Sequence, residues 1–222
     1  TLSGANNYGG TTYANSGNLV IGGANGKIAA GADIGAGGAL TVTNSPDANN
    51  GDRLSNSAGV SLNGGTLRFA HPGGAANYSE TAGALTVGTF ESTVESARAD
   101  DGQTSTLTFA SLSRTGVGSV NFVGEALGDP DNRNRILFTS APVADNAVIG
   151  PWAMYNGTNL ASYTAAQGVI AVGDSVYADL SAKGPSVLPN DAAAIARINT
   201  EGTEGGISLA AEAETSIGAL MQ

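Results

Sequence analysis

The stretch VSLNGGTLRF, residues 60–69, holds two short segments of alternating apolar and polar residues, joined by the glycine pair Gly64-Gly65. Such alternation is typical of a β-strand that buries one face. Because glycine readily takes positive φ angles, a glycine pair suits the corner at which a chain turns from one strand into the next. The stretch therefore predicts a strand, a corner and a second strand in close succession.

The same pattern recurs along the chain. Further alternating segments occupy residues 18–21, 39–43, 84–87, 105–109, 119–123 and 135–139, and further glycine pairs stand at 9–10, 22–23, 37–38 and 73–74. Threonine, which has good strand propensity, often fills the polar positions. Gly, Asn, Asp or Ser groups bound nearly every segment, as short strands require. The pattern predicts an all-β fold made of many short strands.

The spacing of these segments favours a coil over an antiparallel meander. Their apolar centres lie 13 to 27 residues apart, at Leu19, Leu40, Leu67, Leu85, Leu107, Val120 and Leu137. A meander usually repeats every ~8 to 12 residues. A chain that makes one circuit per repeat and stacks in parallel on the previous circuit repeats every ~20 to 30 residues. We therefore expect a parallel β-helix, or β-solenoid.

Three segments interrupt this rhythm. Residues 71–77 and 124–132 are expected to be loops, and the Pro- and Gly-containing residues 181–190 resemble a linker. Asp191–Asn199 (DAAAIARIN) favours one short helix with Asp191 as its cap. The predicted organisation is a β-helix over residues 1–180, the linker over 181–190, and a short helix followed by a further β-repeat block over 191–222. Both ends of the sequence fall inside the repeating pattern, so we expect a fragment of a longer chain.

The composition excludes several classes of partner. Charged residues make up 13% of the chain, with nine Lys and Arg against nineteen Asp and Glu, and the net charge is −10. Because nucleic acids and anionic lipid surfaces attract basic proteins, neither is an expected partner. No apolar run reaches the ~18 to 20 residues that span a bilayer, and any export signal is expected upstream of Thr1. Cysteine is absent, which excludes disulfides and thiolate metal sites.

Few residues could carry catalysis. The one histidine, His71, follows a strand segment and precedes a Gly-rich stretch, and the sequence favours an ordinary loop residue there. A Ser-His-Asp triad would need His71, and no Gly-x-Ser-x-Gly motif accompanies it. The pairs Asp100-Asp101 and Asp129/Asp131 could serve a glycosidase. Aspartates in turns more often bond the nearby backbone, so a structural role is favoured.

Two further candidates concern binding. The loop Glu125–Asn134 offers oxygen ligands for calcium at Glu125, Asp129, Asp131, Asn132 and Asn134, but its spacing matches no EF-hand. Trp152, with Tyr155 and Tyr163 nearby in sequence, could form a sugar platform or pack where the coil changes course, and packing is favoured. We assign no catalytic, cofactor-binding or metal-binding residue, expect no cofactor, and leave calcium binding by the loop open.

The N-terminal residues resemble a known repeat. TLSGANNYGGTTYANSGNL, residues 1–19, is similar to the autotransporter-associated β-strand repeat, whose pattern runs approximately Leu-x-Leu-x-Gly-x-Asn-x-Tyr-x-Gly-x-Thr and continues with a Gly-x-Leu strand. The matching positions are Leu2, Gly4, Asn7, Tyr8, Gly10, Thr11, Gly17 and Leu19, with small differences in spacing. The phrase Ser61–Leu67 resembles the strand and corner that commonly follow. The resemblance implies a right-handed parallel β-helix within the exported passenger region of a large bacterial surface protein.

These observations predict a non-enzymatic, extracellular segment that forms a stiff rod for display, adhesion or assembly of a surface layer. Its expected partners are neighbouring repeats of the same chain, with homotypic assembly and a glycan or cell-surface ligand as open possibilities. One alternative is a self-assembling extracellular filament or matrix subunit, since an open coil end could pair with another copy. A second alternative is a β-helix polysaccharide lyase or hydrolase that uses the aspartates at 100, 101, 129 and 131.

Overall fold

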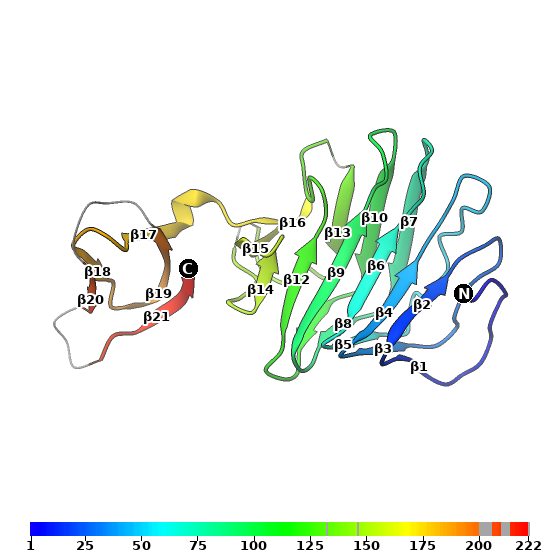
Figure 1. Ribbon diagram of the computed structural model, residues 1–222, viewed down its shortest axis with the longest axis horizontal. Helices are drawn as coiled ribbons and strands as arrows, with labels where there is room; N and C mark the ends of the chain where they lie inside the picture. Colours follow the sequence, from blue (N-terminus) through cyan, green and yellow to red (C-terminus); the bar gives the residue numbers. More distant parts are fainter. Residues whose placement is uncertain (132, 146, 200–205, 210–213, 222) are drawn as a thin grey trace. The chain divides into compact units, whose positions relative to one another are not determined.

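Two compact units make up the chain, Thr1–Ala171 and Val172–Gln222. A computed structural model describes residues 1–131, 133–145, 147–199, 206–209 and 214–221. The fold is all-β, and most neighbouring strands are parallel (Figure 1). In the described residues the helical structure is a short 3₁₀ turn, η1 (Asp174–Val176), so that part of the chain has no helix able to span a membrane.

The largest sheet of the first unit has eight strands. In spatial order they are β16 (Gly168–Ala171), β15 (Asn159–Thr164), β14 (Ala153–Tyr155), β12 (Ser119–Val123), β9 (Glu91–Ala97), β6 (Thr66–Ala70), β4 (Gly38–Val42) and β2 (Gly17–Ile21). From β2 to β14 every neighbouring pair is parallel and in register. Figure 1 shows β2, β4, β6, β9 and β12 side by side and pointing the same way.

Two smaller parallel sheets complete the first unit. One contains β1 (Thr12–Ala14), β3 (Ala32–Gly35), β5 (Val60–Asn63), β8 (Leu85–Val87) and β11 (Leu112–Arg114). The other contains β13 (Asn134–Phe138), β10 (Thr104–Phe109) and β7 (Asn77–Ala82). From β1 to β13 the chain visits the sheets in turn, so that each of these strands pairs with one from the preceding or following visit and not with its neighbour in sequence.

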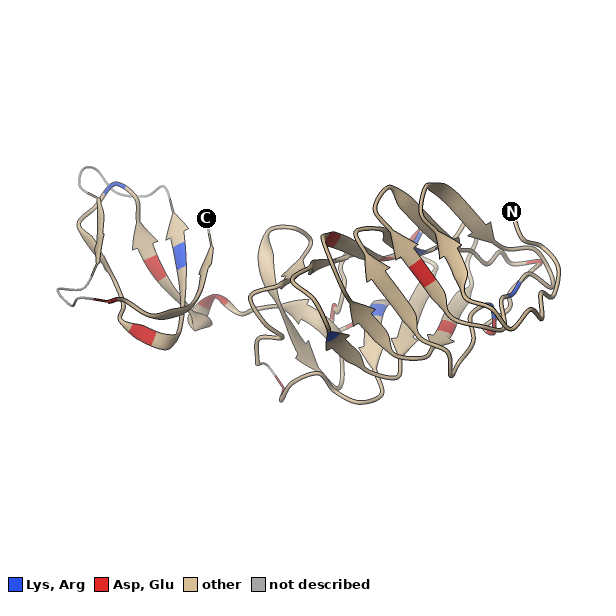
Figure 2. Ribbon diagram, turned by 90° about the horizontal axis from the view of Figure 1, so that it is seen from below, with Lys and Arg blue, Asp and Glu red and all other residues tan. Residues whose placement is uncertain are grey.

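Strand alternation places equivalent residues in columns. Leu40, Leu67, Val94 and Phe122 occupy one register position on consecutive strands of the eight-stranded sheet, and all four are buried. Ile34, Leu62 and Val87 form a second column, and Ala82, Phe109 and Phe138 a third, on the two smaller sheets. These columns belong to one apolar cluster, so the three sheets share a core. Charged residues are sparse on the strands (Figure 2).

The glycine pair at 64–65 makes the predicted corner between β5 and β6. Gly64 has a φ of +95°, which L-residues with a side chain rarely adopt. A Cβ atom on Gly65 would collide with the Ile34 side chain and the Gly35 carbonyl of the preceding circuit. One glycine therefore provides the turn, and the other allows close approach between circuits.

The first unit ends in a change of strand direction. β14 is parallel to β12, but β15 is antiparallel to β14, and β16 is antiparallel to β15. Tyr163 of β15 is buried and its ring packs against Phe138, at a centroid distance of 5.8 Å. The antiparallel strands thus cover the end of the aromatic column.

The second unit is built from two small parallel sheets. They contain β17 (Tyr177–Ser181), β19 (Asp191–Asn199) and β21 (Ile217–Met221), and β18 (Ser186–Leu188) with β20 (Ile207–Leu209). The stretch 181–190, expected as a linker, contains β18, and the two units divide earlier, after Ala171.

The helix predicted for Asp191–Asn199 is wrong, because this segment is the strand β19. It pairs in parallel with β17 on one side and with β21 on the other. Asp191 Oδ1 accepts the Ala193 N–H at 2.8 Å, the type of bond expected of a helix cap, yet the chain continues extended. Pairing on both sides outweighs the local helix propensity of the alanines.

Candidate functional site: a charged pocket and a buried polar network

Asp100 and Asp101 lie in the turn between β9 and β10. The carboxylate of Asp100 accepts the Gly74 N–H at 2.8 Å and the Gly102 N–H at 3.1 Å. Asp101 is exposed, and its carboxylate lies 3.6 Å from the Arg98 guanidinium. Asp100 therefore ties its own turn to the loop of the preceding circuit, the backbone-bonding role that its position in a turn favours.

Asp129 and Asp131 lie together in the loop that precedes β13. Asp129 Oδ1 accepts the Asp131 N–H at 2.9 Å, and the carboxylate of Asp131 lies 3.9 Å from Arg133. Arg133 also donates to the Asp101 carbonyl at 3.2 Å. The two aspartate-bearing loops are thus joined through Arg133.

In the loop Glu125–Asn134, the amide nitrogen of Asn134 forms hydrogen bonds within the fold. Asn134 is fully buried, and its Nδ2 donates to the Ser96 carbonyl at 2.7 Å and the Glu125 carbonyl at 3.0 Å. Asn132 lies outside the described residues. In the described part of the chain, no group of three or more His, Cys, Asp or Glu side chains converges in a way that could hold a metal ion.

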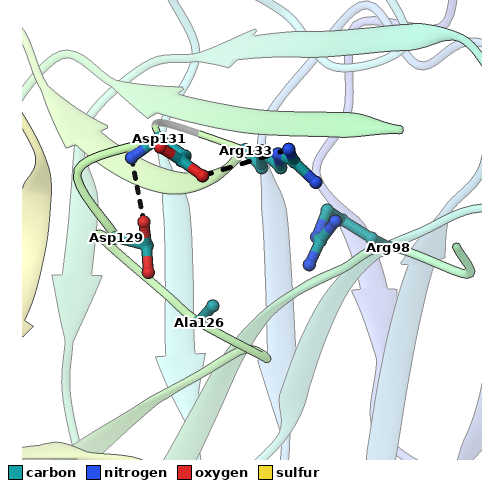
Figure 3. A pocket seen from close by; sticks show the side chains of 5 residues that line it. All are labelled: Arg98, Ala126, Asp129, Asp131 and Arg133. Atoms are coloured by element: carbon teal, nitrogen blue, oxygen red, sulfur yellow. Dashed lines mark hydrogen bonds and ion pairs between the residues drawn. The ribbon is translucent and has the colours of Figure 1, made fainter. Parts of the chain in front are cut away.

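A small pocket opens between these two loops. It has a volume of about 180 Å³ and is lined by Arg98, Ala126, Asp129, Asp131 and Arg133. Figure 3 shows the two arginines together on one side and the two aspartates on the other. The pocket therefore presents donors and acceptors to the same small volume.

His71 follows β6, outside any strand, and is buried with an exposed fraction of 8%. Its ring lies between Phe69 and Tyr78, at centroid distances of 4.3 and 4.2 Å. The Asn44 N–H donates to Nδ1 at 3.2 Å, and Nε2 lies 3.3 Å from Ser105 Oγ. Burial first, and then the positive charge of Arg53, lower the pKa of His71 to about 4.

The contact between Ser105 and His71 resembles part of a catalytic triad but differs in two respects. The second ring nitrogen of His71 accepts a backbone N–H, whereas a triad histidine donates from that nitrogen to a carboxylate. Ser105 is fully buried and its hydroxyl also contacts Ser96 Oγ at 2.9 Å. The geometry supports a packed polar contact.

Arg53 forms the centre of a buried network that the sequence analysis does not predict. Its side chain is fully buried, and its guanidinium donates to the carbonyls of Gly23, Gly26 and Ala48 at 2.8 to 2.9 Å and to Asn44 Oδ1 at 2.6 Å. These acceptors belong to earlier parts of the chain. Arg53 therefore binds the loops of successive circuits together.

Glu80 of β7 completes this network through the backbone. Its carboxylate accepts the N–H groups of Arg53 and Leu54, at 2.9 to 3.2 Å. Burial raises the pKa of Glu80 to about 7, outweighing these two hydrogen bonds and the attraction of Arg53. Strand alternation could have identified Glu80, because Tyr78 and Ala82 flank it on the same inward face.

The aromatic residues are used for packing. Tyr163 Oη donates to the Phe138 carbonyl at 3.0 Å, and Tyr155 Oη donates to the Leu127 carbonyl at 2.8 Å. Trp152 packs partly buried against the core, and the Arg114 guanidinium lies 5.7 Å from its ring centroid. The three residues lie where the sheet changes direction, as the packing interpretation predicts.

Comparisons with known proteins give no relative on which to base a function. No family model matches the chain, and neither a curated protein nor a solved structure is significantly similar to it.

Proposed function

We propose that residues 1–171 form a right-handed parallel β-helix with a mechanical role, as a stiff segment of an extracellular bacterial surface protein. The main support is the register of the eight-stranded sheet. Leu40, Leu67, Val94 and Phe122 repeat at one position on consecutive parallel strands, so each strand repeats the environment of the last. Such a stack resists bending because every circuit is hydrogen-bonded and packed against its neighbours.

The polar network supports the same role. Arg53 bonds to Gly26 in the loop of the preceding circuit and to Ala48 in its own loop, and Asp100 bonds to Gly74 of the preceding loop. Loops held in this way add fixed connections between circuits where the sheets end. Of the polar residues singled out in the sequence, Asp100 and His71 are thus occupied with holding the fold, which is consistent with a non-catalytic segment.

The extracellular location rests on the resemblance of residues 1–19 to the autotransporter-associated repeat. A chain with no cysteine, 33 glycines and 13% charged residues is compatible with it. Display, adhesion and surface-layer assembly remain three uses of the same stiff segment.

Single-molecule stretching tests the mechanical role. The full chain is held by handles at its two ends in magnetic tweezers, and its extension is followed while the force is raised and released. We expect a constant extension at low force, then discrete unfolding steps as circuits detach, and recovery after release. Smooth elongation from the lowest forces, as for an unfolded chain, would contradict the proposal.

A further inference from the structure

Arg98 and Arg133, the two arginines of the charged pocket, have no close contact with a carboxylate among the described residues. Arg68, in the same unit, has one. Arg68 binds both oxygens of Glu95, at 2.7 and 3.1 Å. By contrast, the ion pair of Arg98 with Asp101 is 3.6 Å long, and that of Arg133 with Asp131 is 3.9 Å long. The guanidinium groups in the pocket therefore retain unused capacity to donate hydrogen bonds.

Arg98 is the more unusual of the two because it is buried. Its side chain is 5% exposed, and its Nε atom has no hydrogen-bond partner. A buried donor without a partner costs about 1–3 kcal/mol. Since Arg98 lines the pocket, a shift of its side chain on binding would bring this donor to an acceptor on a molecule bound there.

The chemistry of the lining defines the ligand. A guanidinium presents a planar fork of donors that matches a carboxylate. On the other side of the pocket, the carboxylates of Asp129 and Asp131 accept hydrogen bonds from hydroxyl or ammonium groups and would repel a dianion. The volume of about 180 Å³ is below the range of about 300–1,000 Å³ typical of drug-sized ligands. One small unit with a single negative charge fits these conditions.

We propose that this pocket binds one carboxylate-bearing unit, an acidic sugar or an amino acid. Its carboxylate contacts Arg98 and Arg133, and its hydroxyl or ammonium donors contact Asp129 and Asp131. This gives the coil a binding site on its loop side, in addition to its mechanical role. Neither guanidinium has to leave a close carboxylate partner to accept the ligand.

Titration of the full chain with two pairs of small molecules tests the site. D-Galacturonate is compared with D-galactose, and L-alanine with L-alaninamide, by NMR chemical-shift changes at low ionic strength. We expect at least one carboxylate to bind with a Kd of about 1–10 mM, and its partner without the carboxylate to bind at least about tenfold more weakly. Binding of galacturonate alone identifies a sugar site, and binding of alanine alone an amino-acid site.

Two variants and a control locate the binding. Arg98→Lys keeps the charge but removes Nε and the fork, and should weaken binding at least about tenfold. Asp129→Asn, at an exposed position, should weaken it severalfold. Arg68→Lys makes the same change outside the pocket and should leave binding unchanged. Unfolding midpoints equal to that of the parent chain show that each variant is folded.

Three results would each overturn the proposal. The first is that neither carboxylate binds at about 10 mM. The second is that the molecules without a carboxylate bind equally well. The third is that the folded Arg98→Lys and Asp129→Asn variants both retain full affinity.

Discussion

The two units of the chain use the same parallel strand pairing but bury very different amounts of apolar side chain. In the first unit, columns of Leu, Val and Phe from three sheets meet in one cluster. Among the described residues of the second unit, the buried apolar side chains are Val172, Tyr177, Leu180 and Ala196, while Val187, Leu209 and Leu220 are 53 to 65% exposed. Since both units have hydrogen-bonded ladders, we expect the difference in apolar burial to make the first unit the more stable one.

The largest expected effect comes from truncating a residue in a buried column. Phe122→Ala should lower the free energy of unfolding of the first unit by about 3–5 kcal/mol, because it removes a buried ring and leaves a cavity. Urea unfolding followed by the fluorescence of Trp152, the one tryptophan of the chain, reports on this unit.

Leu220→Ala in the second unit is the matched control for Phe122→Ala. Since Leu220 is 53% exposed, this change should shift stability by only about 0.5 kcal/mol and leave the Trp152 transition in place. An equal shift from both variants would show that the two units do not differ in burial as described.

The second test of the comparison between the units uses arginines, because each unit contains an arginine that contacts several partners. Arg53→Met takes the donors from the buried Gly26 carbonyl and the part-buried Gly23 carbonyl, and one of the two donors from Asn44 Oδ1. It should destabilise the first unit by about 3–5 kcal/mol. Arg197 in the second unit pairs with the exposed carboxylates of Asp174 and Asp179, so Arg197→Met should have a smaller, salt-dependent effect. Thermal unfolding at low and high salt measures both effects. The comparison would be contradicted if the destabilisation caused by Arg53→Met depended on salt and that caused by Arg197→Met did not.

The third test uses pH, since the first unit contains two buried groups with opposite shifts. Glu80 has a pKa raised from 4.5 to about 7, so its contribution to stability is lost as the pH rises through that window. His71 has a pKa lowered from 6.5 to about 4, so its contribution is lost as the pH falls through that window. Between pH 4.5 and 6.5 the two effects oppose each other, and the stability of the parent chain should change little.

Single variants should reveal how strongly each of the two groups makes the free energy of unfolding depend on pH. In Glu80→Gln, His71 is the one of these two buried groups that still titrates, and stability should rise with pH by up to about 1.4 kcal/mol per pH unit. In His71→Asn, Glu80 remains and stability should fall with pH by a similar amount. Urea unfolding at several pH values gives the slopes. In the second unit the pKa of Asp179 is lowered by Arg197, so its contribution is lost only in more acidic solution. If stability changed with pH in the same direction in both variants, the opposite pKa shifts assigned to Glu80 and His71 would be contradicted.

The smallest effect is expected on the outer face of the eight-stranded sheet. Arg68 and Glu95 form a two-contact pair between β6 and β9, but Arg68 is 45% exposed. A double-mutant cycle with Arg68→Ala and Glu95→Ala should give an interaction of about 0.2–1 kcal/mol that decreases with salt. A coupling as large as the Phe122 effect would mean that surface pairs, and not burial, distinguish the units.

The sequence was informative wherever apolar residues alternate. All eight segments predicted from this alternation are strands, from β2 to β13, and the glycine pair at 64–65 is a corner. The strands β7 and β9 were missed because the polar residues Glu80, Ser92 and Ser96 interrupt the apolar residues on their inward faces, although Tyr78 and Ala82 keep the alternation on either side of Glu80. The antiparallel turn at β14–β16 was also missed, since local sequence does not record strand direction.

The same limit applies to the pocket and to the helix. Asp129 and Asp131 stand out as a pair, but Arg98 joins them only because β9 and β12 are in register. In Asp191–Asn199 alanine suits a helix, and only the pairing with β17 and β21 makes the segment a strand. Long-range pairing therefore determines what short-range propensity leaves ambiguous.

The contacts of Arg53 have a consequence for synthesis, when a chain emerges N-terminus first. Its guanidinium holds carbonyls at Gly23 and Gly26, whereas the carboxylate that accepts its own N–H belongs to Glu80. The interior around the earliest loops is thus incomplete until a segment nearly thirty residues downstream of Arg53 has left the ribosome. We therefore expect the surroundings of Arg53 to be completed only after β7 has been synthesised.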